Sequence, residues 1–288
     1  MNSNGLQSTA KLASFFGTII AWTIVLLVSD LPDAVLQAVA GTIPIWLFGV
    51  KVGILFVIIM LGWLLKRLYS LRPFFILLLI LTAGRKALTY LGMTSSYVSQ
   101  GEPAGLLLRL AEFEGARLLL TVVMIVALII MGMRRQDFFF VKGDLRKWKW
   151  PGIVLGFSIM ILTFLFFEYD LPSAATMIKI LPLILATLPF AALAAFDEEM
   201  WSRATLLPYL YRVVGKNHAI MITAFYFGMG HYFGGVPSGV EGFIIAGSLG
   251  WLYATMMLET RGIFMSWLNH FLTNVPTFMF WAVSSISG

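Results

Sequence analysis

Long apolar runs separated by short polar segments limit what this chain can fold into. Up to nine runs can be distinguished, and a helix needs about 20 residues to cross the bilayer core. They cover residues 12–28, 43–65, 74–91, 106–133, 153–167, 176–199, 219–233, 243–258 and 263–284. Each backbone polar group must find a partner inside the membrane, which favours helices. The pattern predicts an all-α, polytopic integral membrane bundle of about eight to nine transmembrane helices.

Composition agrees with this fold class and excludes several functions. The chain of 288 residues is 59% hydrophobic and 12% charged, whereas soluble domains are about 45–50% apolar and about 25% charged. It contains no cysteine, which excludes disulfides, thiolate nucleophiles and cysteine-ligated zinc. The net charge of +6 lies in short loops between apolar runs. We therefore expect the lipid bilayer, and no nucleic acid, to be the partner of these basic residues.

The charges of successive loops alternate in sign. Loops after the second, fourth and sixth apolar runs are basic, and the intervening loops are acidic. The basic residues are Lys66, Arg67, Arg72, Arg134, Arg135, Lys142, Arg146, Lys147, Lys149, Arg212 and Lys216. Because basic loops stay in the cytoplasm, this pattern predicts a cytoplasmic N-terminus.

The most unusual segment contains Glu198, Glu199 and Arg203 and follows the apolar run 178–195, in which Lys179 is the only charged residue. Charge at membrane depth is costly and is usually retained for function. On a helix, Glu199 and Arg203 are four residues apart and can form an ion pair. Glu198 points about 100° away from that pair. We expect Glu198 to lack a local counter-ion and to be available for chemistry.

A second group of charges lies at the end of the third apolar run and the start of the fourth. Its members are Arg85, Lys86, Arg109, Glu112, Glu114 and Arg117. Pairing between neighbouring helices is the usual arrangement of charges at these depths. We interpret this group as a structural ion-pair cluster at the outer ends of two helices.

Two further polar pairs lie in the last third of the chain. Phe227 and His231 are four residues apart, as are His270 and Asn274, so each pair lies on one helical face. At 1.5 Å per helical residue, Glu198, His231 and His270 lie about 20, 18 and 12 Å from the cytoplasmic helix ends. Each pair alone is also compatible with an interhelical hydrogen bond. Their similar depths nevertheless predict that the three side chains converge.

Together these residues resemble the three motifs of the CPBP intramembrane proteases, which include the Rce1-type CAAX prenyl endopeptidases and the Abi proteins. The family patterns EExxxR, FxxxH and HxxxN are fitted, in order, by Glu198, Glu199, Arg203, Phe227, His231, His270 and Asn274. The resemblance implies a protease core over residues 151–288. Residues 1–150 would then form family-variable transmembrane helices and a cytoplasmic basic loop.

The resemblance implies an intramembrane endopeptidase that hydrolyses a peptide bond of a membrane-associated peptide or protein. Glu198 and His231 would hold a water molecule, and Glu198 would take its proton during attack on the scissile carbonyl. His270 and Asn274 would donate hydrogen bonds to the developing oxyanion.

The other motif residues would support this chemistry without entering it. Glu199 and Arg203 would hold the helix and influence Glu198 through their charges, and Phe227 would shape the pocket. This mechanism favours no cofactor. The alternative is a zinc-dependent protease in which Glu198, His231 and His270 bind the metal and leave a fourth position open.

A function of another class stays open. Buried Glu, His and Arg also occur in proton-coupled transporters, and a non-catalytic membrane scaffold fits the same composition. For the protease we expect the bacterial inner membrane, a site open to the cytoplasmic side, and a substrate that is either prenylated or unmodified.

Overall fold

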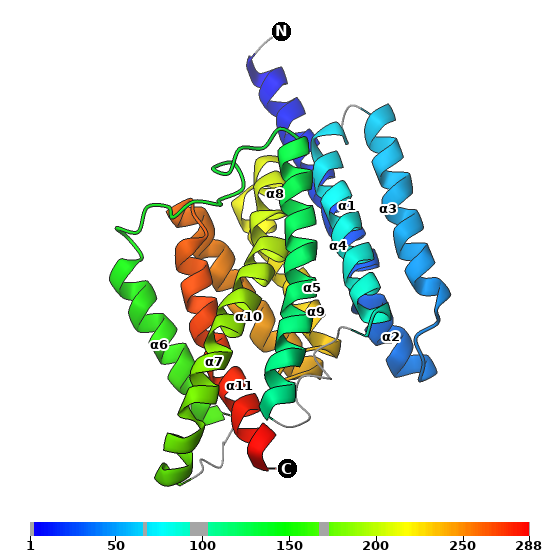
Figure 1. The fold of residues 1–288 in the computed structure, drawn as a ribbon. Helices are drawn as coiled ribbons and strands as arrows, with labels where there is room; N and C mark the ends of the chain where they lie inside the picture. Colours follow the sequence, from blue (N-terminus) through cyan, green and yellow to red (C-terminus); the bar gives the residue numbers. More distant parts are fainter. Residues whose placement is uncertain (1–2, 66–67, 93–102, 167–172, 288) are drawn as a thin grey trace.

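The computed structural model describes residues 3–65, 68–92, 103–166 and 173–287, which fold almost entirely into helices (Figure 1). The helices are α1 (Ser3–Val28), α2 (Leu31–Ala40), α3 (Trp46–Leu64), η1 (Tyr69–Leu71), α4 (Arg72–Tyr90), α5 (Pro103–Ile130), α6 (Lys149–Phe166), α7 (Ala174–Glu199), η3 (Met200–Ala204), α8 (Leu207–Val214), α9 (Lys216–Phe233), α10 (Gly239–Thr260) and α11 (Phe264–Ser287). Within the described ranges there is no strand. The predicted all-α membrane bundle is confirmed.

The predicted number of spans is too high. By length and composition, four stretches of the described residues are suited to cross a membrane, or five if the bent pair of α1 and α2 forms one span. The four are Trp46–Leu64, Gly105–Ile130, Ile180–Val214 and Gly239–Thr260. Helix α6 is short, and α9 and α11 carry polar side chains among their apolar ones. The sequence count treated every apolar run as a span regardless of these interruptions.

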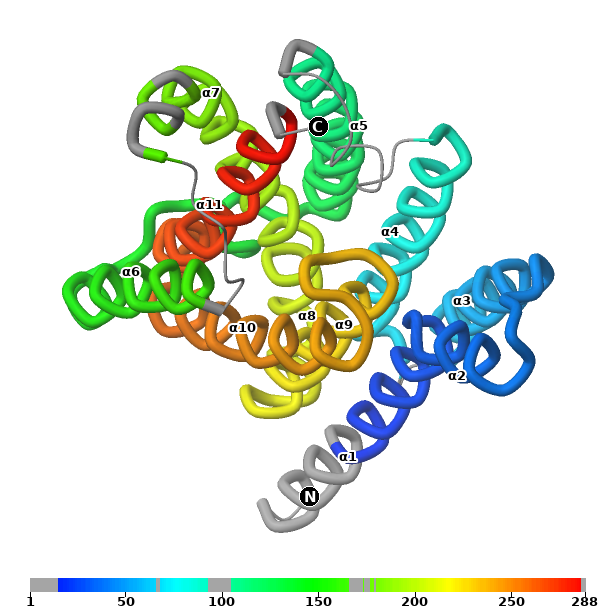
Figure 2. The backbone as a smooth tube through the Cα atoms, turned by 90° about the horizontal axis from the view of Figure 1, so that it is seen from below, coloured from blue at the N-terminus to red at the C-terminus, as the bar shows by residue number. Residues whose placement is uncertain are grey.

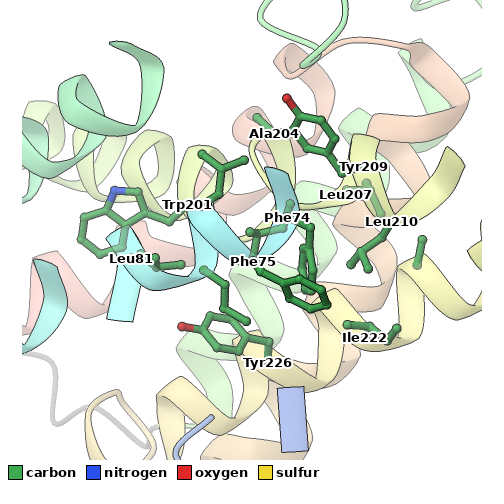
Figure 3. Close-up of a cluster of buried hydrophobic side chains, with 14 of the residues drawn as sticks. Phe74, Phe75, Leu81, Trp201, Ala204, Leu207, Tyr209, Leu210, Ile222 and Tyr226 are labelled. Carbon is green, nitrogen blue, oxygen red and sulfur yellow. The ribbon is translucent and has the colours of Figure 1, made fainter. Parts of the chain in front are cut away.

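One buried apolar core joins the two halves of the chain. Phe74 and Phe75 of α4 are fully buried in it and lie beside Leu207 and Leu210 of α8 and Tyr226 of α9 (Figure 3). Burying each such side chain contributes about 1.5–3 kcal/mol. The first helices of the chain are therefore packed directly on the helices that follow residue 200.

Helices α9 and α10 lie unusually close together, and α11 packs on α6 and α7 (Figure 2). A Cβ atom on Gly228 of α9 would lie 2.7 Å from the carbonyl oxygen of Phe243 and 3.0 Å from the Cα of Gly247. Small residues permit such close backbone approach in membrane bundles. Gly228 thus determines the distance between α9 and α10.

The basic segments gather at one end of the bundle, which is also where α1 begins (Figure 1). Lys147 before α6 and Lys216 of α9 both pair with Glu259 at the end of α10, at 2.5 and 3.1 Å. The backbone N–H of Asp144 donates to the carbonyl of Thr260 over 2.7 Å. The loop between α5 and α6 is therefore packed against the α10–α11 turn.

We predict that Gly228→Ala lowers the melting temperature of the detergent-solubilised protein. The added methyl group would overlap the backbone of α10, and overpacking of this kind costs about 1–3 kcal/mol. Gly53→Ala on α3 is the matched control, because a Cβ there has no atom within 4 Å. Thermal unfolding followed by circular dichroism measures both variants. Equal melting temperatures would contradict the close packing described for α9 and α10.

Candidate active site

The acidic motif lies where α7 changes its helical geometry. Helix α7 continues through Pro182 and Pro189 to Glu199, and the π-helical turn η3 follows before α8 begins. All five residues of η3 are buried. Single π-helical turns are frequent at functional sites because they widen the helix locally. The two glutamates therefore precede a widened turn in the interior of the bundle.

Glu199 and Arg203 form the ion pair that their spacing predicted. Both side chains are fully buried, and Arg203 Nε donates to Glu199 Oε2 over 2.8 Å while Nη2 bonds to Oε1. The guanidinium also lies 4.3 Å from the ring centre of Phe227 and 5.5 Å from that of Tyr253. A two-pronged, fully enclosed pair of this kind holds both side chains in one orientation.

His270 lies between the two glutamates. Its Nδ1 is 2.8 Å from Glu199 Oε1, and its Nε2 is 3.3 Å from Glu198 Oε2. The ring stacks on Tyr253 with centroids 5.1 Å apart. These contacts fix the imidazole on three sides.

His231 approaches Glu198 from α9. Its Nδ1 lies 3.0 Å from the carbonyl oxygen of Phe227, and because a carbonyl only accepts, Nδ1 carries the hydrogen. Its Nε2 is 4.0 Å from Glu198 Oε2, which is longer than a hydrogen bond. A contact of this length between polar groups is one that a water molecule can bridge.

The structure therefore brings Glu198, His231 and His270 together, as their estimated depths predicted. Asn274 lies one helical turn beyond His270, and its Nδ2 donates a long hydrogen bond of 3.5 Å to the carbonyl of Ala191. The catalytic roles assigned to these side chains stay predictions.

The expectation that Glu198 lacks a counter-ion is wrong. Arg117 Nη2 of α5 lies 2.7 Å from Glu198 Oε1, and it also faces Glu114 Oε1 at 3.5 Å. The spacing of residues along one helix identifies only neighbours on that helix, whereas Arg117 comes from a different one.

The interpretation of the second charge group changes accordingly. Arg117 lies near the middle of α5 rather than at its outer end, and Arg85 pairs with Asp30 at 3.3 Å instead of with α5. The sequence analysis grouped Arg117 with the charges at the start of the run 106–133, although Arg117 lies eleven residues into that run, and this misplaced its depth. The sequence did contain a pattern that indicates a polar face on this helix, because Glu114, Arg117 and Thr121 follow the i, i+3, i+7 spacing of one helical face.

Tyr253 is a site residue that the sequence analysis missed. Its hydroxyl lies 2.7 Å from Thr273 Oγ1, and the side chain is fully buried against His270. Tyr253 belongs to none of the three motifs, so only its position in the fold reveals it.

An apolar cavity of about 520 Å³ adjoins the histidines. Helices α6, α9, α10 and α11 form its walls, and Glu198 is not among the residues that line it. The lining residues are Ile159, Leu162, Thr163, Leu165, Phe227, His231, Val236, Pro237, Gly242, Ile245, Ala246, Leu249, Tyr253, His270, Thr273, Asn274 and Thr277. The lining is mostly apolar, and His231, His270 and Asn274 contribute nitrogen-bearing side chains to it.

The zinc alternative, with Glu198, His231 and His270 as ligands, stays a prediction. Among the described residues, no group of three His, Cys, Asp or Glu side chains is placed to hold a metal ion. Both ring nitrogens of His270 face carboxylate oxygens instead.

Comparison with known proteins agrees with the motifs. Residues 179–276 match the family model described as type II CAAX prenyl endopeptidase Rce1-like. The resemblance to the CPBP family is confirmed. The match covers about a third of the chain and includes all three motifs. No curated protein and no solved structure matches the chain. Together with the apolar helices, the Rce1-like match supports an integral membrane protease.

We predict that Arg203→Met strongly destabilises the protein. The substitution leaves Glu199 buried without its guanidinium partner, and breaking a buried pair in this way costs about 3–5 kcal/mol. Thermal unfolding in detergent measures the loss. Arg134→Met is the matched control, since Arg134 pairs with Asp137 at an exposed position where such pairs contribute little. A similar small shift for both variants would show that the Glu199–Arg203 pair does not stabilise the fold.

Proposed function

We propose that this protein is an intramembrane endopeptidase in which Glu198 activates a water molecule. The observation that carries the proposal is the position of Glu198 Oε2, which lies 3.3 Å from His270 Nε2 and 4.0 Å from His231 Nε2. Both histidines line the apolar cavity. A carboxylate between two imidazoles, next to an apolar pocket, is suited to acid–base chemistry on a bound amide.

The attacking water would lie between Glu198 Oε2 and His231 Nε2. Because His231 Nδ1 donates to the Phe227 carbonyl, the neutral ring presents the Nε2 lone pair to that water. The water would donate one hydrogen bond to each group. Its oxygen would then be free to attack the scissile carbonyl carbon while Glu198 Oε2 takes the proton.

The tetrahedral intermediate needs hydrogen-bond donors for its negative oxygen. His270 and Asn274 both line the cavity. Once Glu198 Oε2 has taken the proton of the water, it would no longer accept from His270 Nε2, and His270 and Asn274 could then donate to the oxyanion in a site of low dielectric. As the carbon–nitrogen bond breaks, the proton held by Glu198 passes to the leaving amine. The products are a new carboxylic acid and a new amine, which become carboxylate and ammonium by proton exchange, and Glu198 returns to its starting state.

We propose that the cavity receives an apolar part of the substrate, either a large side chain or a prenyl group. Leu162 of α6 and Ile245 of α10 line it and are also exposed on the surface of the bundle. A lipid-facing opening between these helices would let a membrane-associated substrate enter from the bilayer. This fits a CAAX-type endopeptidase, whose substrates carry an apolar anchor.

The arrangement of charges supports the orientation inferred from the sequence. At one end of the bundle Lys147 and Lys216 pair with Glu259, and Arg212 pairs with Asp137. We propose that this end is cytoplasmic, that the membrane is a bacterial inner membrane, and that the scissile bond reaches the site from the cytoplasmic side.

We predict that Glu198→Gln abolishes cleavage while the protein still accumulates in the membrane. Removing a general base typically slows an enzyme by about 10²–10⁴-fold. Peptides released from membranes of cells that express either protein can be compared by mass spectrometry. Peptides that depend on the wild type identify the substrate and the cleaved bond.

Other outcomes of this comparison favour the alternative functions. Cleavage by the Glu198→Gln variant at the wild-type rate would contradict the proposal, and identical peptides with no cleavage would favour a scaffold or a transporter. Stoichiometric zinc in the purified active enzyme, with loss of activity on chelation, would instead favour the metalloprotease.

We further predict that Ala246→Phe reduces kcat/KM at least about 10-fold for a substrate with a bulky apolar group, because changes in pocket size are discriminated to this extent. Ala246 is buried in the cavity wall on α10. Ser248→Phe is the control, since Ser248 lies on the same helix with its side chain exposed. Equal rates for the two variants would show that the substrate does not occupy the cavity.

A further inference from the structure

Helix α5 contributes a polar face to the site although it lies outside the segment that matches the family model. Arg117 Nη2 lies 2.7 Å from Glu198 Oε1. One helical turn further along, Thr121 Oγ1 donates to Asp197 Oδ1 over 2.6 Å and accepts a hydrogen bond from Trp201 Nε1 at 2.8 Å. Thus α5 contacts the residues on both sides of the acidic motif.

Arg117 is held firmly in its own position. Its side chain is 9% exposed, and its guanidinium carbon lies 5.0 Å from the ring centre of Trp201 and 5.2 Å from that of Phe113. Glu114 Oε1, on the preceding turn of α5, lies 3.5 Å from Nη1. A guanidinium placed between two rings and a carboxylate has little freedom to turn away from Glu198.

The two oxygens of Glu198 consequently face different partners. Oε1 accepts from Arg117, and Oε2 faces the Nε2 atoms of His270 and His231. Without Arg117, the carboxylate could rotate and offer both oxygens to His270, which is the nearer histidine. The space in which the proposed water must bind would then be altered.

We propose that Arg117 is a positioning residue for the protease reaction. The Arg117 guanidinium binds Oε1 of Glu198 and compensates the negative charge of this carboxylate. As a result, Oε2 alone faces the histidines and the attacking water. This inference rests on the proposed function. It means that the first half of the chain supplies part of the active site as well as packing for it.

The Thr121 contacts serve the same arrangement. Because Asp197 precedes Glu198 and Trp201 follows it by three residues, hydrogen bonds from one threonine to both fix the register of α5 against α7 and η3. That register places Arg117 opposite Glu198. A shift of one residue along α5 would rotate Arg117 by about 100° and separate the pair.

Activity measurements on full-length variants test the positioning role. We expect Arg117→Met to lower kcat about 10- to 100-fold, as loss of an orienting partner commonly does, with little change in KM because Arg117 does not line the cavity. Arg117→Lys should recover part of the loss, since lysine restores the charge but not the two-pronged geometry. Lys51→Met is the matched control, because it removes a buried cation that pairs with Asp33 and with the carbonyl of Ser29, away from the site.

A stability measurement that needs no activity tests the ion pair itself. Arg117→Met should lower the melting temperature, because Glu198 then keeps a buried charge without its cation. Adding Glu198→Gln to this variant should recover part of the loss, whereas the same addition to Lys51→Met should not. Strictly additive losses in the Arg117 series would overturn the inference.

The results separate this inference from the proposed function. If the wild type shows no cleavage that depends on Glu198, the proposed function is wrong. If the wild type cleaves and Arg117→Met keeps the wild-type kcat, only the positioning role is wrong. A fall in kcat for Lys51→Met equal to that for Arg117→Met would also overturn it, because the effect would then reflect general loss of stability.

Discussion

The compensation of buried charge is the constraint on which the rest of this structure depends. Arg117, Arg203 and the carboxylates of Glu114, Asp197, Glu198 and Glu199 lie in the interior of an apolar bundle, where an unpaired charge is expensive. Arg203 compensates Glu199, and Arg117 compensates Glu198. His270 contacts both carboxylates and so joins the two pairs into one network. Removing either arginine leaves a carboxylate without its cation in apolar surroundings.

This network also explains why particular helices must lie beside one another. Its members come from α5, α7, η3 and α11, and His231 extends it to α9. Helix α10 approaches α9 closely at Gly228, and it contacts α11 where Tyr253 stacks on His270. Helix packing and electrostatic pairing therefore support the same arrangement, since neither the ion pairs nor the aromatic contacts would form in a looser bundle.

The site is asymmetric in a way that suits hydrolysis of a membrane-associated peptide. Charged partners surround Glu198 on the α5 side, and the apolar cavity adjoins the histidines between α6, α10 and α11. An apolar substrate group is stabilised by apolar surroundings, whereas a polarised water molecule needs polar groups around it. In the proposed reaction, the two separate regions that adjoin at His231 and His270 would meet both demands.

The sequence by itself determined the helical membrane class, the pair of Glu199 and Arg203, and the three motifs whose residues meet at one depth. These features follow from hydropathy and from the 3.6-residue period, which act over short distances along the chain. The cavity walls and the partner of Glu198 were decided by the tertiary structure. Arg117 and Glu198 are 81 residues apart, and no helical period relates residues on different helices. Only the packing of α5 against α7 brings the guanidinium to the carboxylate.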